Sequence, residues 1–545
     1  MQKNDSAAQV SLLSSFRLMI ILMLWAFLPA GCAMWPEPTR SVHVGETGPM
    51  GDCADFFASL DGLTAASGAL DSGYARVKHY PYLRSDRFIA SFRDDVEDSH
   101  AFTAWVDFMQ TLDQSARQFE IANLSDTDIA AMDSVNGRKA IARKVVECGN
   151  LLKNAELLNT ENKTQLHGDV YVKDEYNSLR RVLGLYPITS VFVSRGVNQW
   201  HAEARERFST EPSTDWQQTV RYVPVTKPGN RLAHRIIQGV EHDALGIPAY
   251  SADDRHTLFQ EYAPVWEIQT QGDADRIGSP AWNGKGRIGV DTGRPQTYTH
   301  LSFTRFGKAI FTQLNYIIWF PSRPRDGAWD IYAGLLDGLN FRVTLDVKGD
   351  PILYETIHNC GCYYKAYPTS RLQVREKMDY AEPLLVLKAP EMQPASEMMV
   401  VGMAHRTHYV MHLYSVSRKF EDSPRPAAGS LRRKDENRFP VRSLTPPQAT
   451  GNALAIAAQS GAGTYTLADY GELKGLPHVD GKRKSMFDRY GLVPGSERQE
   501  RFILWPTGVL SPGAMRQWGR HAVAFVGKRH FDDPFYLDKM FVPTD

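Results

Sequence analysis

Apolar residues recur at intervals of three and four along two stretches of the N-terminal third. The first stripe consists of Phe102, Trp105, Val106, Met109, Leu112, Ala116 and Phe119. The second consists of Ile141, Val145, Cys148, Leu152 and Ala155. This spacing predicts two helices, each with one buried face. A third helix is predicted from Asp174, as its N-cap, to Gly184, because Pro187 would prevent its continuation.

The pattern changes beyond about residue 210, where alternation with a period of two takes over. Apolar and polar residues alternate strictly from Leu339 to Asp346, which predicts a strand with one buried face. A turn over residues 347–350 then leads into a second strand, Ile352 to His358. The two strands are predicted to form a hairpin.

Three further segments are predicted to be extended. Residues 310–320 are almost continuously apolar, which indicates an interior strand in which Gln313 and Asn315 need hydrogen-bond partners. Residues 397–416 indicate another hairpin, which turns near residues 404–406. Residues 522–526 indicate a buried strand, followed by a helix that begins at 533–534.

Together these patterns predict an α+β fold. A helical domain over residues 51–205 would be followed by a larger, β-rich α+β domain with antiparallel hairpins over residues 206–545. Within the second domain, residues 418–450 are rich in proline and carry a basic run at 432–434, so they are predicted to be a long surface excursion.

Composition places the chain among folded globular proteins, since 43% of its residues are hydrophobic and 23% are charged. The 62 lysines and arginines are balanced by 62 aspartates and glutamates. Without a net positive charge the protein has no field to attract polyanions, so nucleic acid is not expected as a partner.

The N-terminus carries an export signal. Lys3 and Arg17 precede an apolar run, Leu18 to Ala30, that is shorter than the ~20 residues needed to cross a bilayer. The run ends in Leu-Pro-Ala-Gly-Cys, which resembles the lipobox of bacterial lipoproteins, although Pro29 stands where leucine is usual. The resemblance implies cleavage after Gly31 and lipidation of Cys32.

The same resemblance implies a place in the cell. Residues 1–31 would be removed, residues 32–50 would be a tether, and the lipid on Cys32 would make the membrane a partner. Because Ala33 and not aspartate follows the cysteine, the resemblance implies the outer membrane, with the protein facing the periplasm. The alternatives are an ordinary signal peptide cut after Ala33 and an uncleaved anchor.

Four cysteines remain besides Cys32. In an exported protein disulfides are expected, and sequence order favours a pair between Cys53 and Cys148. Both lie in the N-terminal third, and the apolar stripe turns Cys148 inward.

The other two cysteines lie in the segment His358-Asn359-Cys360-Gly361-Cys362. If the preceding strand continues, His358, Cys360 and Cys362 share one face and could bind zinc or copper. If Gly361 instead bends the chain, the two sulfurs could meet in a strained, easily reduced disulfide with a redox role. A third reading gives both cysteines a purely structural role, with His358 hydrogen-bonded at a strand end.

Two further histidines could join this site. On a strand from residue 407 to 416, His408 and His412 share a face, while His405 lies in the turn. Because side chains four apart on a strand are ~13 Å apart, only one of the two could join His358 as a metal ligand or base. Otherwise both are ordinary cross-strand residues.

A last group of polar and aromatic residues lies near the C-terminus. It comprises Arg516, Trp518, His521, Arg529, His530 and Asp532. Arginines, an indole and histidines in a connecting segment could bind an anionic or sugar-like ligand, or they could serve capping and packing.

These observations lead to two hypotheses on function. The sequence has no Gly-x-Ser-x-Gly elbow, Walker loop or His-Glu-x-x-His motif, which favours an envelope lipoprotein with a binding or assembly role. The alternatives are a metal-dependent periplasmic hydrolase that uses His358, Cys360 and Cys362, and a thiol redox protein that uses Cys360 and Cys362. Whether the protein is an enzyme is left open.

Overall fold

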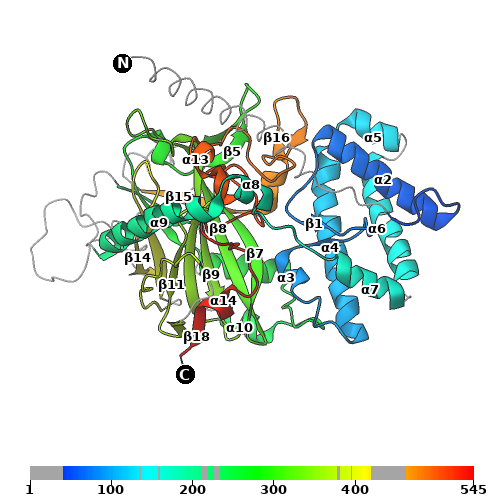
Figure 1. Ribbon diagram of the computed structural model, residues 1–545, viewed down its shortest axis with the longest axis horizontal. Helices are drawn as coiled ribbons and strands as arrows, with labels where there is room; N and C mark the ends of the chain where they lie inside the picture. Colours follow the sequence, from blue (N-terminus) through cyan, green and yellow to red (C-terminus); the bar gives the residue numbers. More distant parts are fainter. Residues whose placement is uncertain are drawn as a thin grey trace, which may run out of the picture.

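The computed structural model describes residues 41–133, 137–157, 160–209, 219–225, 233–376, 381–393, 396–418 and 462–544. The predicted signal, Cys32 and nearly all of the predicted excursion lie outside these residues. Figure 1 shows helices of the N-terminal third on one side of the molecule, in blue and cyan, and a large sheet on the other. Among the described residues, no helix has the length and apolar character needed to cross a bilayer. The α+β fold class is confirmed.

The helical part contains α2 (Pro49–Ser67), α3 (Arg87–Ala90), α4 (Ser99–Asn123), α5 (Asp126–Met132), α6 (Gly137–Glu156) and α7 (Thr160–Asp169). The two predicted apolar stripes form the inner faces of α4 and α6, except that Ala155 is exposed. Asp98 caps the start of α4, since its carboxylate accepts hydrogen bonds from the backbone N–H groups of His100 and Ala101. A short ribbon of β1 (Ala75–Arg76) and β2 (Arg84–Ser85) packs beside α4.

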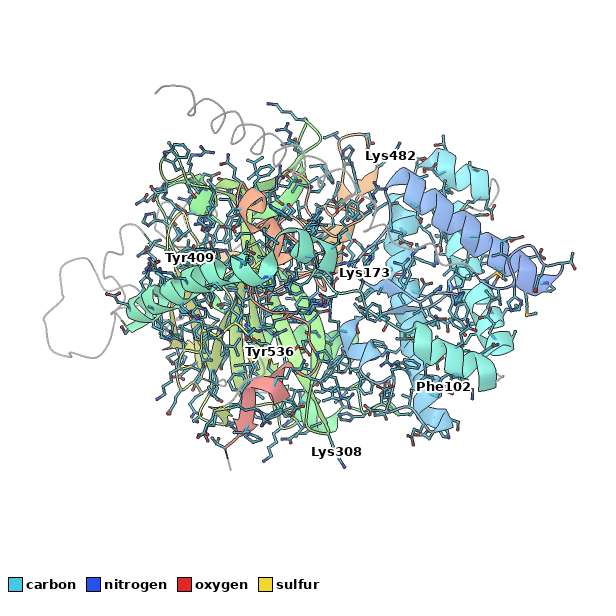
Figure 2. All side chains as sticks on the ribbon, viewed as in Figure 1. Phe102, Lys173, Lys308, Tyr409, Lys482 and Tyr536 are labelled. Carbon is cyan, nitrogen blue, oxygen red and sulfur yellow. A yellow bond between two sulfur atoms is a disulfide. The ribbon has the colours of Figure 1, made fainter. Side chains whose placement is uncertain are left out.

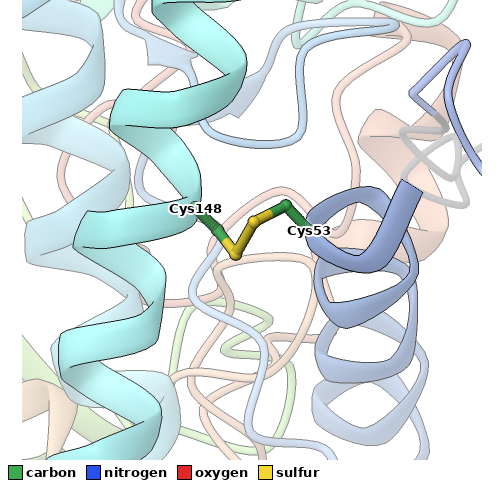
Figure 3. Close-up of a disulfide and its surroundings, with 2 residues drawn as sticks. All are labelled: Cys53 and Cys148. Carbon is green, nitrogen blue, oxygen red and sulfur yellow. A yellow bond between two sulfur atoms is a disulfide. The ribbon is translucent and has the colours of Figure 1, made fainter. Parts of the chain in front are cut away.

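The predicted disulfide between Cys53 and Cys148 is confirmed. It joins α2 to α6, two helices whose cysteines are 95 residues apart (Figure 3). The bond therefore closes a long loop of the unfolded chain, which is the arrangement in which a disulfide stabilises most in the chain-entropy model.

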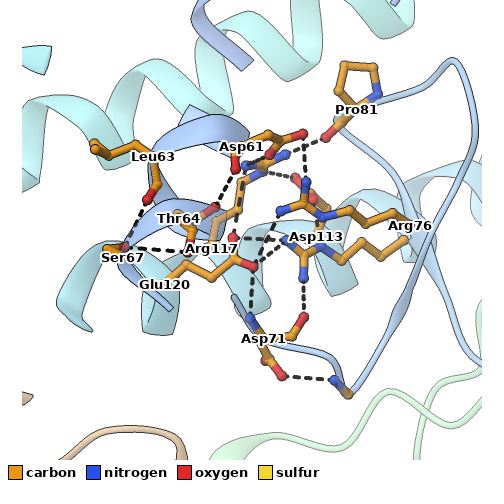
Figure 4. Close-up of polar contacts among 12 residues, drawn as sticks. Asp61, Leu63, Thr64, Ser67, Asp71, Arg76, Pro81, Asp113, Arg117 and Glu120 are labelled. Carbon is orange, nitrogen blue, oxygen red and sulfur yellow. Dashed lines mark hydrogen bonds and ion pairs between the residues drawn. The ribbon is translucent and has the colours of Figure 1, made fainter. Parts of the chain in front are cut away.

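A network of buried charges lies beneath these helices (Figure 4). Arg84 donates hydrogen bonds to Asp113 at 3.0 Å and to both oxygens of Glu120 at 2.8 and 2.9 Å. Arg117 donates to Asp113 at 2.8 Å and to Asp61 at 2.9 Å. Every charge in this network faces a partner of opposite sign, which offsets the cost of removing it from water.

The sheet has ten strands in the order β11-β10-β9-β8-β7-β15-β3-β4-β13-β14. Their bounds are β3 Thr219–Pro224, β4 Val265–Gln269, β7 Gln296–Phe306, β8 Ala309–Arg323, β9 Gly334–Leu345, β10 Pro351–His358, β11 Lys365–Pro368, β13 Glu397–Met403, β14 Val410–Ser417 and β15 Ala462–Asp469. β15 lies between β7 and β3 and is parallel to both, so a late segment of the chain joins two groups of strands.

The strands predicted from the pattern are found in the expected places, but the single buried face predicted for residues 339–346 is wrong, because Asn340, Arg342 and Thr344 are buried as well. β9 and β10 form the first hairpin, β13 and β14 the second, and β8 is interior between β7 and β9. The two polar side chains of β8 have the partners they need, because Asn315 donates to Ser302 at 2.9 Å and Gln313 accepts from Ser302 at 3.2 Å.

Shorter elements complete the fold. They are α10 Ala233–Gly239, α11 Ala252–Glu261, η3 Asp273–Asp275, β5 Ser279–Trp282, β6 Ile288–Asp291, β12 Leu372–Val374, η5 Tyr470–Lys474, β16 Leu476–Pro477, β17 Arg483–Lys484, α13 Arg501–Leu504, η6 Trp505–Thr507, α14 Tyr536–Met540 and β18 Phe541–Pro543.

The third predicted helix ends at Gly184 as expected, but its predicted start at Asp174 is wrong. Asn177, and not Asp174, caps a short helix, α8 (Ser178–Leu183), and the chain then enters a long one, α9 (Tyr186–Ser209). Pro187 lies in the first turn of α9, where a missing backbone N–H costs nothing. Both helices lie against the sheet-containing part (Figure 1), although the predicted helical domain extends to residue 205.

The strand predicted at residues 522–526 is also wrong. The segment is irregular and makes one isolated bridge, between Ala522 and His530. Side chains take the place of a neighbouring strand, because the backbone N–H of Ala524 donates to the hydroxyl of Tyr176 and the next two N–H groups donate to Glu382. The helix expected from residue 533 begins later, as α14.

Candidate functional site

Seven large apolar side chains are exposed along α8 and the first half of α9. They are Leu179, Val182, Leu183, Leu185, Ile188, Val191 and Phe192, each between 46% and 74% exposed. We call this set the α8–α9 surface. Two more exposed apolar residues, Phe502 and Ile503, lie on α13, which adjoins η6, a neighbour of both helices. Contiguous apolar surface of this kind usually marks an interaction site.

The charge of this segment has one sign. Residues 178–200 contain three arginines, Arg180, Arg181 and Arg195, and no acidic residue. The guanidinium of Arg181 is bound to the backbone oxygens of Thr507 and Gly527, whereas Arg195 is exposed beside the apolar side chains. The surface is therefore apolar with a basic component.

The opposite face of α9 covers a cavity of about 230 Å³. Its apolar and aromatic lining comprises Val193, Val197, Trp200, Tyr332, Tyr363, Tyr364, Leu385, Leu504, Val523 and Phe525. Polar groups reach the cavity from His201, Cys362, Glu382, Glu500 and Arg529, and burial lowers the pKa of His201 to about 4. It is smaller than the ~300 to 1,000 Å³ of most ligand pockets, so it would hold a small molecule or one end of a larger one.

Glu500 is the most unusual group in this cavity. Burial raises its pKa to about 7, although the charges of Arg323, Arg498 and Arg516 act in the opposite direction. The hydrogen bonds of these arginines go elsewhere, as when Arg498 donates to the backbone oxygens of Leu335 and Leu336. A carboxyl group that changes protonation near neutrality is suited to general acid or base chemistry.

A chain of buried acidic and histidine side chains lies behind the cavity. Nδ1 of His408 lies 2.9 Å from a carboxylate oxygen of Asp337, and its Nε2 lies 3.4 Å from Asp275. Nδ1 of His358 lies 3.5 Å from the other oxygen of Asp337. His408 and His358 therefore lie in one group of side chains, as one alternative from the sequence proposed. The carboxylate of Asp337 connects the two histidines.

Protonation in this chain differs between the two histidines. Burial alone would lower the pKa of His408, but Asp275 and Asp337 outweigh it and raise that pKa. For His358 burial outweighs Asp337 and lowers the pKa. Burial would raise the pKa of Asp337, yet the two histidines hold it well below its usual range. The surroundings therefore favour the charged forms of His408 and Asp337 and the neutral form of His358.

Backbone strain gathers around the same residues. Tyr363, which lines the cavity, has a φ of 60°, and Leu336, His408 and Ser511 also have positive φ, at 57°, 52° and 44°. Arg516 supports this strained region, because it donates to the backbone oxygens of Cys360, Leu510 and Ser511. Strain of this kind persists where the surrounding structure fixes it, and it clusters at functional sites.

The predicted metal site is not assembled by the residues described. The strand ends at His358, and Cys360 and Cys362 lie in a turn, so the three side chains do not share a strand face. His412 pairs with Gly402 across the second hairpin, apart from the chain of acidic and histidine groups. Within the described ranges, no three His, Cys, Asp or Glu side chains are arranged to hold a metal ion.

The C-terminal residues predicted to bind a ligand together do not line one common cavity, although the rings of Trp518 and His521 lie close to each other. Trp518 and Asp532 line a second cavity, of about 550 Å³, between the helical part and the sheet, while Arg529 lines the first. His530 lies 3.3 Å from Asp174. His521 is buried, which lowers its pKa to about 4, and Arg516 is bound to backbone oxygens.

The α8–α9 surface and Glu500 were not predicted. A signal for the surface is present in the sequence, since a run that is apolar and basic without acidic residues is typical of membrane-surface helices. Glu500 offers no such signal, because its burial depends on segments far away in the chain.

Comparisons with known proteins do not extend this picture. No family model matches the sequence, and neither the curated proteins nor the solved structures include one that is similar to it. Function has to be inferred from the geometry and charge of the described residues.

Proposed function

We propose that this protein is an envelope lipoprotein with a binding role, which lies on an anionic membrane surface through the α8–α9 surface. The observation that carries the proposal is the exposure of seven large apolar side chains in a segment with arginines and no acidic residue. Lipidation at Cys32, implied by resemblance, would hold this surface near the outer membrane, on its periplasmic side.

A membrane fits this surface better than a protein partner does. Phe192 and its apolar neighbours can enter the boundary between headgroups and acyl chains while α9 lies parallel to the membrane. Arginines beside them are attracted to anionic lipids by ~1 kcal/mol each. Two weak attachments, one acyl anchor and one amphipathic face, together give stable binding where a single acyl chain is marginal.

The test separates the anchor from the surface. In the Cys32→Ser chain, Phe192→Glu should weaken sedimentation with vesicles of phosphatidylglycerol and phosphatidylethanolamine. Loss of ~2 kcal/mol of apolar burial corresponds to about 30-fold. The control is Asn198→Glu, which adds the same charge at an exposed, polar position of α9. It should cost no more than ~1 kcal/mol, about fivefold.

Two results would overturn the proposal. One is equal vesicle binding by Phe192→Glu and Asn198→Glu. The other is binding that does not depend on anionic lipid, because the arginines would then have no role. For the anchor itself, Cys32→Ser in cells should release the protein from the membrane fraction or leave its precursor unprocessed.

A further inference from the structure

The segment from His358 to Cys362 forms a tight turn that brings two cysteines together. The backbone N–H of Gly361 donates to the oxygen of His358 at 2.7 Å, and the N–H of His358 donates to the oxygen of Cys362 at 3.0 Å. Gly361 has φ of +94°, and a Cβ there would lie 2.6 Å from the backbone oxygen of Ala522. Both observations require glycine at this position.

The turn changes what the two thiols can do. On an extended strand, alternate side chains are ~6.5 to 7 Å apart, too far for a disulfide. In the turn, Cys360 and Cys362 flank Gly361, and the thiol of Cys360 acts on the pKa of the Cys362 thiol. They are the two free cysteines among the described residues, and both are buried.

Only one of these two cysteines borders the cavity under α9. Cys362 belongs to its lining and Cys360 does not. A small molecule in the cavity would therefore reach Cys362 first, and Cys360 would be the neighbour that attacks second. Cys53 and Cys148 are joined in the same structure, which indicates that the chain folds where disulfides form.

A base is needed for this chemistry, because the thiolate is the nucleophile. The neighbouring thiol of Cys360 and burial together raise the pKa of the Cys362 thiol well above its usual value. Glu500 and Cys362 line the same cavity, and the charge of Glu500 contributes to that shift. Since its own pKa is about 7, Glu500 is ionised at slightly alkaline pH and can accept a proton.

We propose that Cys360 and Cys362 are a redox-active pair that reduces low-molecular-weight disulfides entering this cavity, with Glu500 as the base. Cys362 loses its proton to Glu500 and attacks the disulfide, which forms a mixed disulfide and releases one thiolate. Cys360 then attacks the sulfur of Cys362, which releases the second thiol and closes the Cys360–Cys362 bond. Two protein thiols are oxidised, and one small disulfide becomes two thiols, which carry the two protons.

The experiment uses the full chain in detergent, with bis(2-hydroxyethyl) disulfide as a small uncharged probe. After acid quenching and alkylation, mass spectrometry of the peptide with residues 360–362 should show an internal disulfide and no retained adduct. The Cys360→Ser chain should instead retain one half of the probe on Cys362. Either an unreacted peptide or a bond from this peptide to Cys53, Cys148 or another chain would overturn the proposal.

The role of Glu500 is tested by the rate and by its dependence on pH. Glu500→Gln should slow adduct formation in the Cys360→Ser background about 100-fold and remove the rise in rate near pH 7. The matched control is Glu497→Gln, an exposed carboxylate three residues earlier, which should leave both unchanged. Equal rates for the two variants would overturn the assignment. This chemistry does not require membrane docking, so vesicle binding and probe reduction can fail independently.

Discussion

The helical part and the region of α8, α9 and the cavity place their side chains in opposite ways. In the helical part, Arg84 and Arg117 are buried, but carboxylates pair with both, and a disulfide joins the helices around them. In the second region, apolar side chains are exposed to water, and Glu500 is buried while its arginine neighbours bond elsewhere.

This difference separates stability from function within one chain. Local costs such as exposed apolar area, strained φ angles and a buried acid are expected where a structure serves binding or chemistry. They are tolerated because other parts of the fold supply the stability. This contrast can be tested by removing a stabilising feature from the helical part or a costly feature from the region of α8, α9 and the cavity.

The largest effect is expected from the disulfide. Replacing Cys53 and Cys148 with serine should lower the free energy of unfolding by about 4 to 5 kcal/mol, because the loop they close spans 95 residues. Denaturant unfolding measures this, with the reduced wild-type chain as control, which should be equally destabilised. A loss below about 1 kcal/mol would mean that the helical part does not depend on the bond.

The buried charges should give the next largest effect. Arg84→Met removes a buried hydrogen-bond partner from both Asp113 and Glu120 and should cost about 3 to 5 kcal/mol. The control is Arg138→Met, which removes an exposed ion pair with Asp126 and should cost less than about 1 kcal/mol. Similar losses for both would contradict the view that the buried network stabilises the helical part.

Local pattern accounts for what the sequence predicted well. Periodicity found α4 and α6, because each is decided by its own buried face, and it also found the two hairpins, although both faces of β9 are buried. The Cys53–Cys148 pair followed from chain order and an inward-facing stripe. The parallel pairing of β15 with β3 and β7 could not be predicted, because it joins segments separated by more than 150 residues.

Tertiary contacts explain the errors and omissions. Residues 522–526 have the apolar composition of a strand, but Tyr176 and Glu382 satisfy their backbone. The cavity under α9 is lined by residues from 193 to 529, so spacing along the chain carries no sign of it. For residues 358–362, the sequence left three interpretations open. The turn requires glycine at position 361 because of its positive φ and because the backbone of Ala522, a residue far away in the chain, lies against it.

The buried pair of His408 and Asp337 should give stability a measurable dependence on pH. Because the folded-state pKa of His408 is raised above 6.5, its contribution is fully present below that pH and is lost as pH rises through the folded-state pKa. The free energy of unfolding should therefore decline on the alkaline side more steeply for wild type than for His408→Gln. Parallel curves for the two chains would contradict the assigned protonation.

The smallest effect on stability is expected at the exposed surface itself. Ile188 and Val191 are 60% and 66% exposed, so replacing both with serine should change the free energy of unfolding by no more than about 0.5 kcal/mol. The matched substitution is Leu152→Ala on the buried face of α6, which should cost about 2 to 5 kcal/mol. The surface variant should nevertheless bind vesicles more weakly in the Cys32→Ser chain. If it instead unfolds as readily as Leu152→Ala, the exposed residues of α9 contribute to folding, and the contrast between the two regions fails.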